Sequence, residues 1–120
     1  MNICKLFKKI QENGVDEISL KFSSDDYRGS ELKEMECHPD TLKEDDLIPA
    51  DFVKEVLGTE NPEEMSLWEL VERAALLTAD HLAGGWDEVE VTFNIWDGEV
   101  GVRGWSRNEF SVSQTVAELQ

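Results

Sequence analysis

The first apolar positions of the chain have helical spacing. Ile3, Leu6, Phe7 and Ile10 follow the i, i+3, i+4, i+7 pattern of one helix face, and lysines occupy positions between them. Gly14 tolerates the left-handed backbone conformation with which many helices end. The pattern therefore predicts an amphipathic helix that closes at Asn13-Gly14.

The pattern then changes to strict alternation. Ile18, Leu20 and Phe22 alternate with polar residues, which is typical of a strand covered on one face. Turn-forming residues at 23–30 precede residues 31–38, which we expect to return as an antiparallel strand. The acids and the lysine of this second strand suit an exposed sheet edge.

Two further helices are predicted in the middle of the chain. Residues 48–58 (IPADFVKEVLG) indicate a short helix that stops at Gly58. Ser66 and Glu69 form the S-x-x-E capping box, in which each side chain satisfies a free backbone N–H, and they predict the start of a longer helix. Gly84-Gly85 are expected to end this helix. Its apolar stripe comprises Leu67, Leu70, Val71, Ala74, Leu77, Thr78 and His81, and it is widened by Trp68, Ala75, Leu76 and Ala79.

The last third of the chain predicts a hairpin. Asp97-Gly98 is the preferred pair for a two-residue type I′ turn, which would place Trp96 opposite Glu99 and Phe93 opposite Val102. This arrangement puts Val91, Phe93, Ile95, Val100 and Val102 on the core face, and Glu90, Thr92, Trp96, Glu99, Arg103 and Trp105 on the other face. Residues 109–116 are expected to add a final strand.

These elements define a fold class. The order helix–strand–strand–(helix)–helix–strand–strand–(strand) predicts a single α+β domain over residues 1–120, with an antiparallel sheet packed by two main helices. A chain of 120 residues with four Trp and five Phe is long and aromatic enough for one packed core.

Four features of the chain carry a resemblance to a known family. They are Phe22, the turn SSDDYRGS, the segment SLWELVE, and Gly84-Gly85-Trp86 before the hairpin. With these features the chain resembles an uncharacterised family of small acidic bacterial proteins with a helix–GGW–hairpin core. The resemblance implies the α+β fold and implies no particular activity.

Charge narrows the class of partner. The formal net charge is −16, and residues 31–72 contain 14 acidic and three basic residues, which leaves −11 in the middle third. A field of this sign repels nucleic acid and anionic lipid and speeds encounter with basic surfaces. We therefore expect a basic protein partner and no direct binding of nucleic acid or membrane.

Two groups of residues are candidates for binding that partner. The acidic candidates are Glu44, Asp45, Asp46, Asp51, Glu55, Glu60, Glu63 and Glu64, and the hairpin candidates are Trp96, Arg103 and Trp105, which belong to types enriched in binding hot spots. Each group also has a structural explanation. The acids would keep the chain in solution, and a sheet face packed under helices would account for the hairpin residues.

No catalytic or metal-binding motif is found. Cys37 and His38 are neighbours in a predicted strand, so alternation sends their side chains to opposite faces and prevents a nucleophile–base pair. Cys4, Cys37, His38 and His81 lack the spacing of a zinc site, and the paired aspartates lack the pattern of a calcium loop. We therefore expect no enzyme activity, no metal and no cofactor.

The first residues, the length of the apolar runs and the cysteines together indicate the cellular compartment. The first residues show no separate apolar stretch and no cleavage site, which argues against a secretory signal, and no apolar run approaches the length of a membrane span. The two distant cysteines are then expected to stay reduced in the cytoplasm.

Two hypotheses for function follow. The leading one is a non-enzymatic inhibitor, of the immunity or mobile-element antidefence type, that uses carboxylates in place of phosphates to occupy the basic surface of a nucleic-acid-acting protein. The alternative is a small enzyme or ligand-binding protein with a cleft between the second main helix and the hairpin, lined by His81, Trp86 and Arg103. A homodimer formed through the exposed edge strand is a third interpretation. Without a ligand, His81 would be a structural histidine and Trp86 would fill the corner between helix and hairpin.

Overall fold

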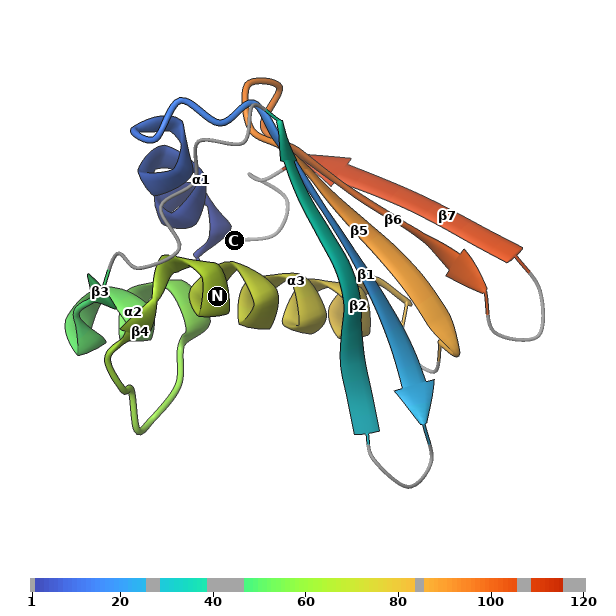
Figure 1. Cartoon of the computed structure of the whole chain (residues 1–120), viewed down its shortest axis with the longest axis horizontal. Coiled ribbons are helices and arrows are strands. Elements are labelled where there is room, and N and C mark those ends of the chain that lie inside the picture. The colour runs from blue at the N-terminus through green and yellow to red at the C-terminus, as the bar shows by residue number, and fades with distance from the viewer. Residues whose placement is uncertain (1, 26–28, 39–46, 84–85, 106–108, 116–120) are drawn as a thin grey trace.

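The computed structural model describes residues 2–25, 29–38, 47–83, 86–105 and 109–115 (Figure 1). The elements are α1 (Ile3–Gln11), β1 (Glu17–Asp25), β2 (Gly29–His38), β3 (Leu47–Ile48), α2 (Ala50–Leu57), β4 (Met65–Ser66), α3 (Leu67–Ala83), β5 (Glu88–Asn94), β6 (Glu99–Trp105) and β7 (Glu109–Thr115). This order confirms the predicted α+β fold, and the sequence pattern missed only the two-residue strands β3 and β4.

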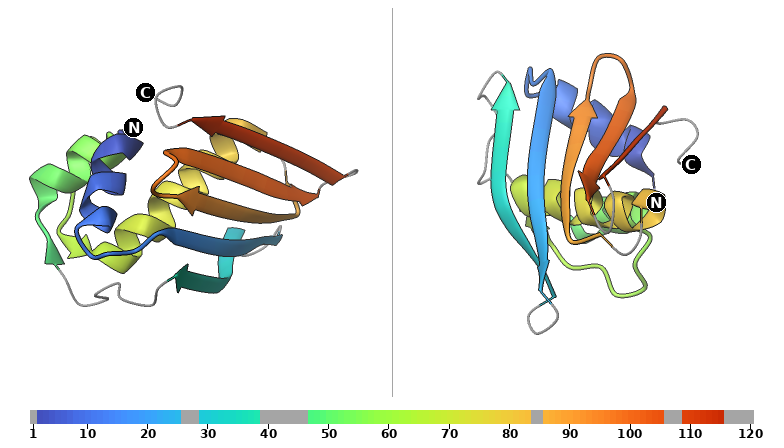
Figure 2. Two further views of the ribbon diagram at one scale, coloured as in Figure 1. Left: turned by 90° about the horizontal axis from the view of Figure 1, so that it is seen from above. Right: turned by 90° about the vertical axis from the view of Figure 1, so that its right-hand side faces the viewer.

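One antiparallel sheet organises the molecule. Its strand order is β2-β1-β5-β6-β7, so the N-terminal hairpin joins the C-terminal hairpin through the pairing of β1 with β5. Helices α1 and α3 pack against one face, and the right-hand view of Figure 2 shows the strands in front of the helices with no helix over the other face. An antiparallel sheet tolerates this arrangement when its open face is polar.

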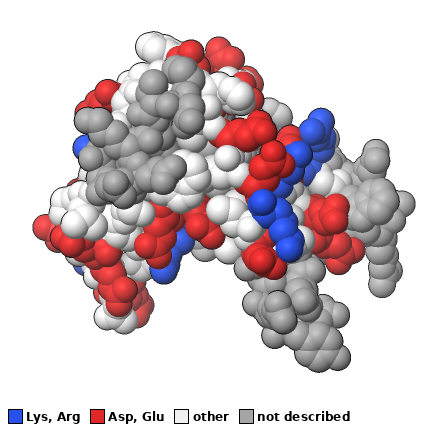
Figure 3. All heavy atoms as spheres, viewed as in Figure 1, with Lys and Arg blue, Asp and Glu red and all other residues white. Residues whose placement is uncertain are grey.

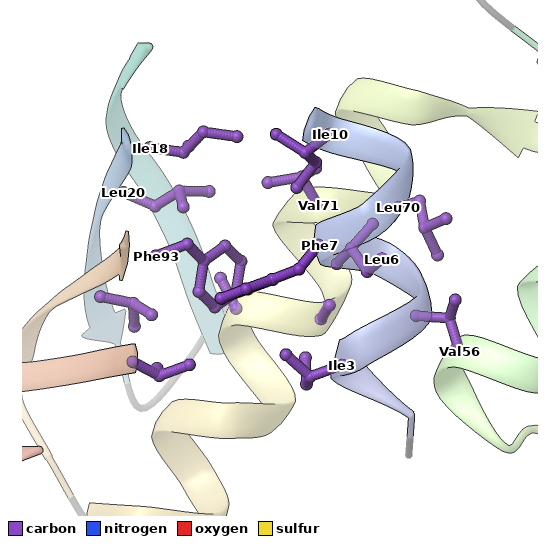
Figure 4. Close-up of a cluster of buried hydrophobic side chains, with 14 of the residues drawn as sticks. Ile3, Leu6, Phe7, Ile10, Ile18, Leu20, Val56, Leu70, Val71 and Phe93 are labelled. Atoms are coloured by element: carbon purple, nitrogen blue, oxygen red, sulfur yellow. The ribbon is translucent and has the colours of Figure 1, made fainter. Parts of the chain in front are cut away.

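The core lies between α1, α3 and the covered sheet face. The apolar face of α1 is buried as predicted, and the Phe7 ring meets Phe93 edge-on with centroids 5.3 Å apart (Figure 4). Ile18 and Leu20 of β1 are fully buried beside them. Since burial of one large apolar side chain contributes about 1.5–3 kcal/mol, this cluster supplies much of the drive to fold.

Strand β2 forms the exposed edge that its charges predict. Its inward side chains are Cys37, which is buried, and Met35, which is half-buried. The pairing with β1 shifts between Lys21 and Phe22, because Lys21 faces Glu34 whereas Phe22 faces Leu32. Lys33 is thus the extra residue of a bulge, a feature that increases strand twist and blunts an edge.

The start of α3 matches half of the predicted capping box. The backbone N–H of Glu69 donates to Ser66 Oγ at 3.2 Å. The Glu69 carboxylate does not reach back to the cap, because it accepts from Arg73 Nη2 at 3.0 Å instead. The reciprocal half of the prediction was therefore wrong.

The buried face of α3 also departs from the predicted stripe. Leu77 is 43% exposed and His81 is exposed, contrary to the prediction, whereas Ala75 and Ala79, which were expected to widen the stripe, are fully buried. The buried face of α3 is thus shifted toward these two alanines. Thr78 is buried as predicted, and its hydroxyl donates to the Ala74 carbonyl at 2.7 Å.

The hairpin between β5 and β6 has a longer turn than predicted. Asn94 pairs with Glu99 and Phe93 with Val100, so four residues, 95–98, form the connection. A type I′ turn needs positive φ at both central residues, and here Gly98 (φ 67°) has it while no described non-glycine residue does. The Ile95 N–H donates to the Asp16 carbonyl at 2.9 Å, which extends the β1–β5 pairing by one bond beyond Glu17 and Asn94.

The register error does not alter the faces of the hairpin. Because the shift amounts to two residues, the alternation is preserved, and all five residues predicted for the core face are buried. Arg103 now lies opposite Glu90 instead of Thr92. The predicted strand β7 is present at the sheet edge next to β6.

Two glycines of β6 provide a test of this sheet. A Cβ at Gly104 would lie 2.8 Å from Val89 Cα and would collide with the Glu88 carbonyl, whereas a Cβ at Gly101 would meet nothing within 4 Å. Gly104→Ala should therefore lower the free energy of unfolding by about 1–3 kcal/mol, since backbone must move to admit the methyl group. Urea denaturation measures the change. Gly101→Ala is the matched control, and equal loss in both variants would contradict the close approach of β5 and β6 at Gly104.

Candidate functional site

The described acidic candidates gather at one end of the molecule. Asp51 lies in the first turn of α2, and Glu60, Glu63 and Glu64 lie in the segment that leads from α2 to β4; all four side chains are exposed. We call these four residues the acidic end. The predicted candidates Glu44, Asp45 and Asp46 lie outside the described residues.

Local structure holds the acidic end together. Ile48 of β3 pairs with Met65 of β4. The chain between these two strands, which contains α2 and residues 58–64, therefore forms one loop that begins and ends at the same place. Gly58 takes the left-handed conformation (φ 70°) that ends α2. The projecting corner of the space-filling view, which corresponds to the loop below α2 in Figure 1, is covered mainly by acidic side chains (Figure 3).

The ion pairs of the described residues do not involve the acidic end. In the part of the chain that the structure describes, none of the four residues of the acidic end forms an ion pair. Glu55, the remaining described candidate, is different: its carboxylate lies 2.8 Å from Lys5 Nζ and ties α2 to α1.

An exposed apolar side chain lies beside the acidic end. Leu47 of β3 is 64% exposed and lies opposite Ser66, three residues before the helix that carries Asp51. Sequence reasoning missed Leu47, because it falls in a segment without periodicity. The combination of an exposed leucine and unpaired carboxylates is suited to contact with another protein.

The open face of the sheet is also charged, but there the charges are paired. Lys21 Nζ lies 3.4 Å from Glu34 and 3.8 Å from Glu90, and Glu90 in turn lies 2.9 Å from Arg103 Nη2. The four residues form a row across four strands in which the sign of the charge alternates. We call this row the charge ladder.

The charge ladder corrects one interpretation of the hairpin. The face that carries Arg103 is not packed under helices, because α1 and α3 cover the opposite face and the Arg103 side chain is 71% exposed. The side chain of Trp105 lies outside the described part of the structure.

A hollow of about 1010 Å³ opens beside the charge ladder. Its polar lining includes Lys21, Lys33, Arg103, Ser23 and Ser111, together with Glu88 and Glu90. The alternation of each strand identifies these side chains as outward-facing, but only the pairing of β1 with β5 assembles them, and the sequence does not reveal that pairing. The three cations are each paired with a carboxylate, so the hollow has mixed charge.

One carboxyl group of the charge ladder has a shifted pKa. A side-chain hydrogen bond with Glu36, and then the hydrogen bond and positive charge of Lys21, hold the pKa of Glu34 below its ordinary value. A lowered pKa favours the charged form in the folded state. Its stabilising effect is thus present above the ordinary pKa of glutamate and is lost as the pH falls through the lowered value.

The three residues predicted to line a ligand cleft lie apart. His81 is exposed on α3, and Arg103 points outward from the open sheet face. Trp86 is buried on the covered side, where its ring lies 6.4 Å from Phe22 and its indole N–H donates to Asp80 Oδ1 at 3.1 Å. Trp86 thus fills the joint between α3 and β5, as predicted, while Gly84-Gly85 lie outside the described residues.

Trp96 occupies a different position from the one predicted. It lies in the β5–β6 turn and not on a strand face, and it is 68% exposed. Its indole N–H donates to the carboxylate of Asp16, which precedes β1. No local sequence pattern predicts this bond, because the two residues are 80 positions apart.

The remaining chemical candidates do not form a site. Cys37 is buried whereas His38 is exposed, as the alternation predicted, and both cysteines are free thiols. Among the described residues, no three His, Cys, Asp or Glu side chains are grouped so that they could hold a metal ion. Within the same ranges, no helix combines the length and apolar character needed to cross a membrane.

Comparisons with family models, with curated proteins and with solved structures find no match for this chain. The proposal for its function therefore rests on its own residues.

The charge ladder predicts a specific pH response. Lys21→Met should raise the pKa of Glu34, because it removes one hydrogen bond and one positive charge while the contact with Glu36 remains. A ¹³C NMR titration of the Glu34 carboxyl carbon measures this. Lys33→Met is the control, since Lys33 pairs with Glu31. A Glu34 pKa that stays the same without Lys21 would refute the ladder.

The separation of His81 from Trp86 predicts unequal effects on stability. His81→Ala should change the free energy of unfolding by less than about 0.5 kcal/mol, because the side chain is exposed. Trp86→Ala should cost about 3–5 kcal/mol, because it opens a cavity beside Phe22. Thermal and urea denaturation measure both changes. A large loss of stability in the His81 variant would contradict the exposed position and indicate that the side chain is buried in the core.

Proposed function

We propose that this chain is a non-enzymatic binding module whose acidic end engages a basic surface of a partner protein. The observation that carries the proposal is the unequal pairing of charge. Over the open sheet face, Lys21 and Arg103 compensate their neighbouring carboxylates, whereas Asp51, Glu60, Glu63 and Glu64 form no ion pair within the described residues.

Unpaired carboxylates are a good means of attracting a basic partner. Like charges held on one short excursion repel one another, and a partner that brings cations removes this repulsion when it binds. The net charge of −16 also accelerates the encounter with a basic surface, and the acceleration weakens as salt screens the field. Leu47 adds an apolar contact that salt does not weaken.

The class of partner that fits best is a protein that acts on nucleic acid. Such proteins carry Lys and Arg surfaces that bind phosphates, and carboxylates can occupy the same cations. In this version the chain is an inhibitor, of the immunity or antidefence type, that competes with DNA or RNA for the partner. The charge of the chain supports this class, and it disfavours nucleic acid itself as the ligand.

The proposal predicts which charges matter for binding. The immobilised full chain should capture a basic protein from the cells that encode it, and Asp51→Asn/Glu60→Gln/Glu63→Gln/Glu64→Gln should lower the affinity at least about tenfold, because several exposed charge contacts are lost together. The affinity for the purified partner should fall steeply with salt and in the presence of competing nucleic acid. Surface plasmon resonance at several salt concentrations measures both.

A control variant with the same net charge makes the experiment specific. Glu17→Gln/Glu36→Gln/Asp87→Asn/Glu88→Gln removes four carboxylates that lie away from the acidic end, and it should bind like the wild-type chain. Equal loss in the two variants would show that total charge, and not the acidic end, governs binding. Affinity that is indifferent to salt would contradict the proposal altogether.

A further inference from the structure

Trp96 is the most exposed of the large apolar side chains that the structure describes, at 68%, and it is held in place. Its indole N–H donates to the Asp16 carboxylate, and the Asp16 carbonyl accepts from the Ile95 N–H at 2.9 Å. The turn is also attached to α1, because Gln11 Nε2 donates to the Ile95 carbonyl at 3.2 Å. These contacts fix the indole edge and leave the ring face to solvent.

The surroundings of the ring are negatively charged. Asp97 follows Trp96 in the turn and Glu99 closes it, and both are exposed. In the ranges that the structure describes, neither of these residues nor Asp16 forms an ion pair. An exposed, fixed indole ring thus has one carboxylate bonded to its edge and two more in the same hairpin, and none of the three forms an ion pair within the described residues.

An arginine side chain is the group that best fits an exposed indole ring with carboxylates beside it. A guanidinium group stacks on an indole face, where the ring quadrupole attracts it, and its N–H groups, which point outward in a plane parallel to the ring, remain free to bind a carboxylate beside the ring. Because the ring is already ordered, little side-chain entropy is lost when the cation binds. We infer that Trp96, with Asp16, Asp97 and Glu99, is a docking point for an arginine side chain of a partner protein.

This docking point is separate from the acidic end. The Asn2 N–H at the start of α1 donates to Val56 of α2, whereas Gln11 at the end of α1 reaches the Trp96 turn. The two surfaces therefore lie about one length of α1 apart, which is about 14 Å for nine residues. The inference goes beyond the proposed function, because an arginine could occupy the Trp96 site whichever surface the main partner uses.

The test uses the ¹⁵N-labelled full chain and a hexa-arginine peptide as the probe. The Trp96→Phe spectrum identifies the indole N–H signal of Trp96 among those of the four tryptophans. We expect this signal and the backbone signal of Asp97 to shift saturably during titration. Asp16→Asn keeps an oxygen that can accept the indole N–H but removes the charge, and Asp97→Asn removes a charge that takes part in no such bond; each should weaken binding about threefold.

A control variant, a control peptide and the pattern of shifted signals together decide the outcome. Asp87→Asn removes an exposed carboxylate elsewhere and should leave the titration unchanged. A titration in which the signals of Asp51 and residues 60–64 shift while that of Trp96 does not would overturn this inference and support the acidic end as the binding surface. A titration in which only the Trp96 signal shifts would support this inference and count against the acidic end. An equal response to hexa-lysine would overturn the assignment to arginine, because a lysine ammonium has no planar group that could stack on the ring.

Discussion

The pairing of β1 with β5 is the interaction on which the rest of the structure depends. It joins two hairpins that are distant in sequence, and its register places Ile18 opposite Phe93 and Leu20 opposite Val91. All four side chains then face α1 and α3, where they are buried. Since the helices cover only this face, every polar position of the alternating strands is sent to the opposite face and into water.

The distribution of charge follows from this one-sided packing. On the open sheet face, neighbouring strands bring Lys21 and Arg103 against Glu34 and Glu90, so cross-strand pairs neutralise one another. The acidic end lies between β3 and β4, outside the five-stranded sheet, and its four carboxylates form no ion pair within the described residues. A strongly acidic chain thus has one region of compensated charge and one of uncompensated charge, and the second is the region that we propose as a binding surface.

Much of the fold could be predicted because the informative patterns are local. The apolar spacing of α1, the alternation of β1 and Gly58 at the end of α2 were all confirmed. The faces of the β5–β6 hairpin were also correct despite the wrong turn, because a shift of two residues preserves alternation.

The errors share one physical origin, which is contact between segments distant in sequence. Ile95 and Trp96 of the four-residue turn bond to Asp16, and α3 buries Ala75 and Ala79 against the core while His81 is exposed. The hollow beside Arg103 likewise needs the pairing of β1 with β5, and the short pairing of β3 with β4 has no periodic signal. Local patterns contain none of this information.

Charge that is compensated over the open sheet face and uncompensated at the acidic end should produce different local electrostatic potentials. The paramagnetic relaxation of amide protons by a cationic and an anionic nitroxide of similar size measures them, because the ratio of the two effects reports the potential at each residue. We expect the most negative potentials around Asp51 and residues 60–64, and clearly weaker ones along Lys21, Glu90 and Arg103. A potential at the charge ladder as negative as that at the acidic end would contradict this expectation.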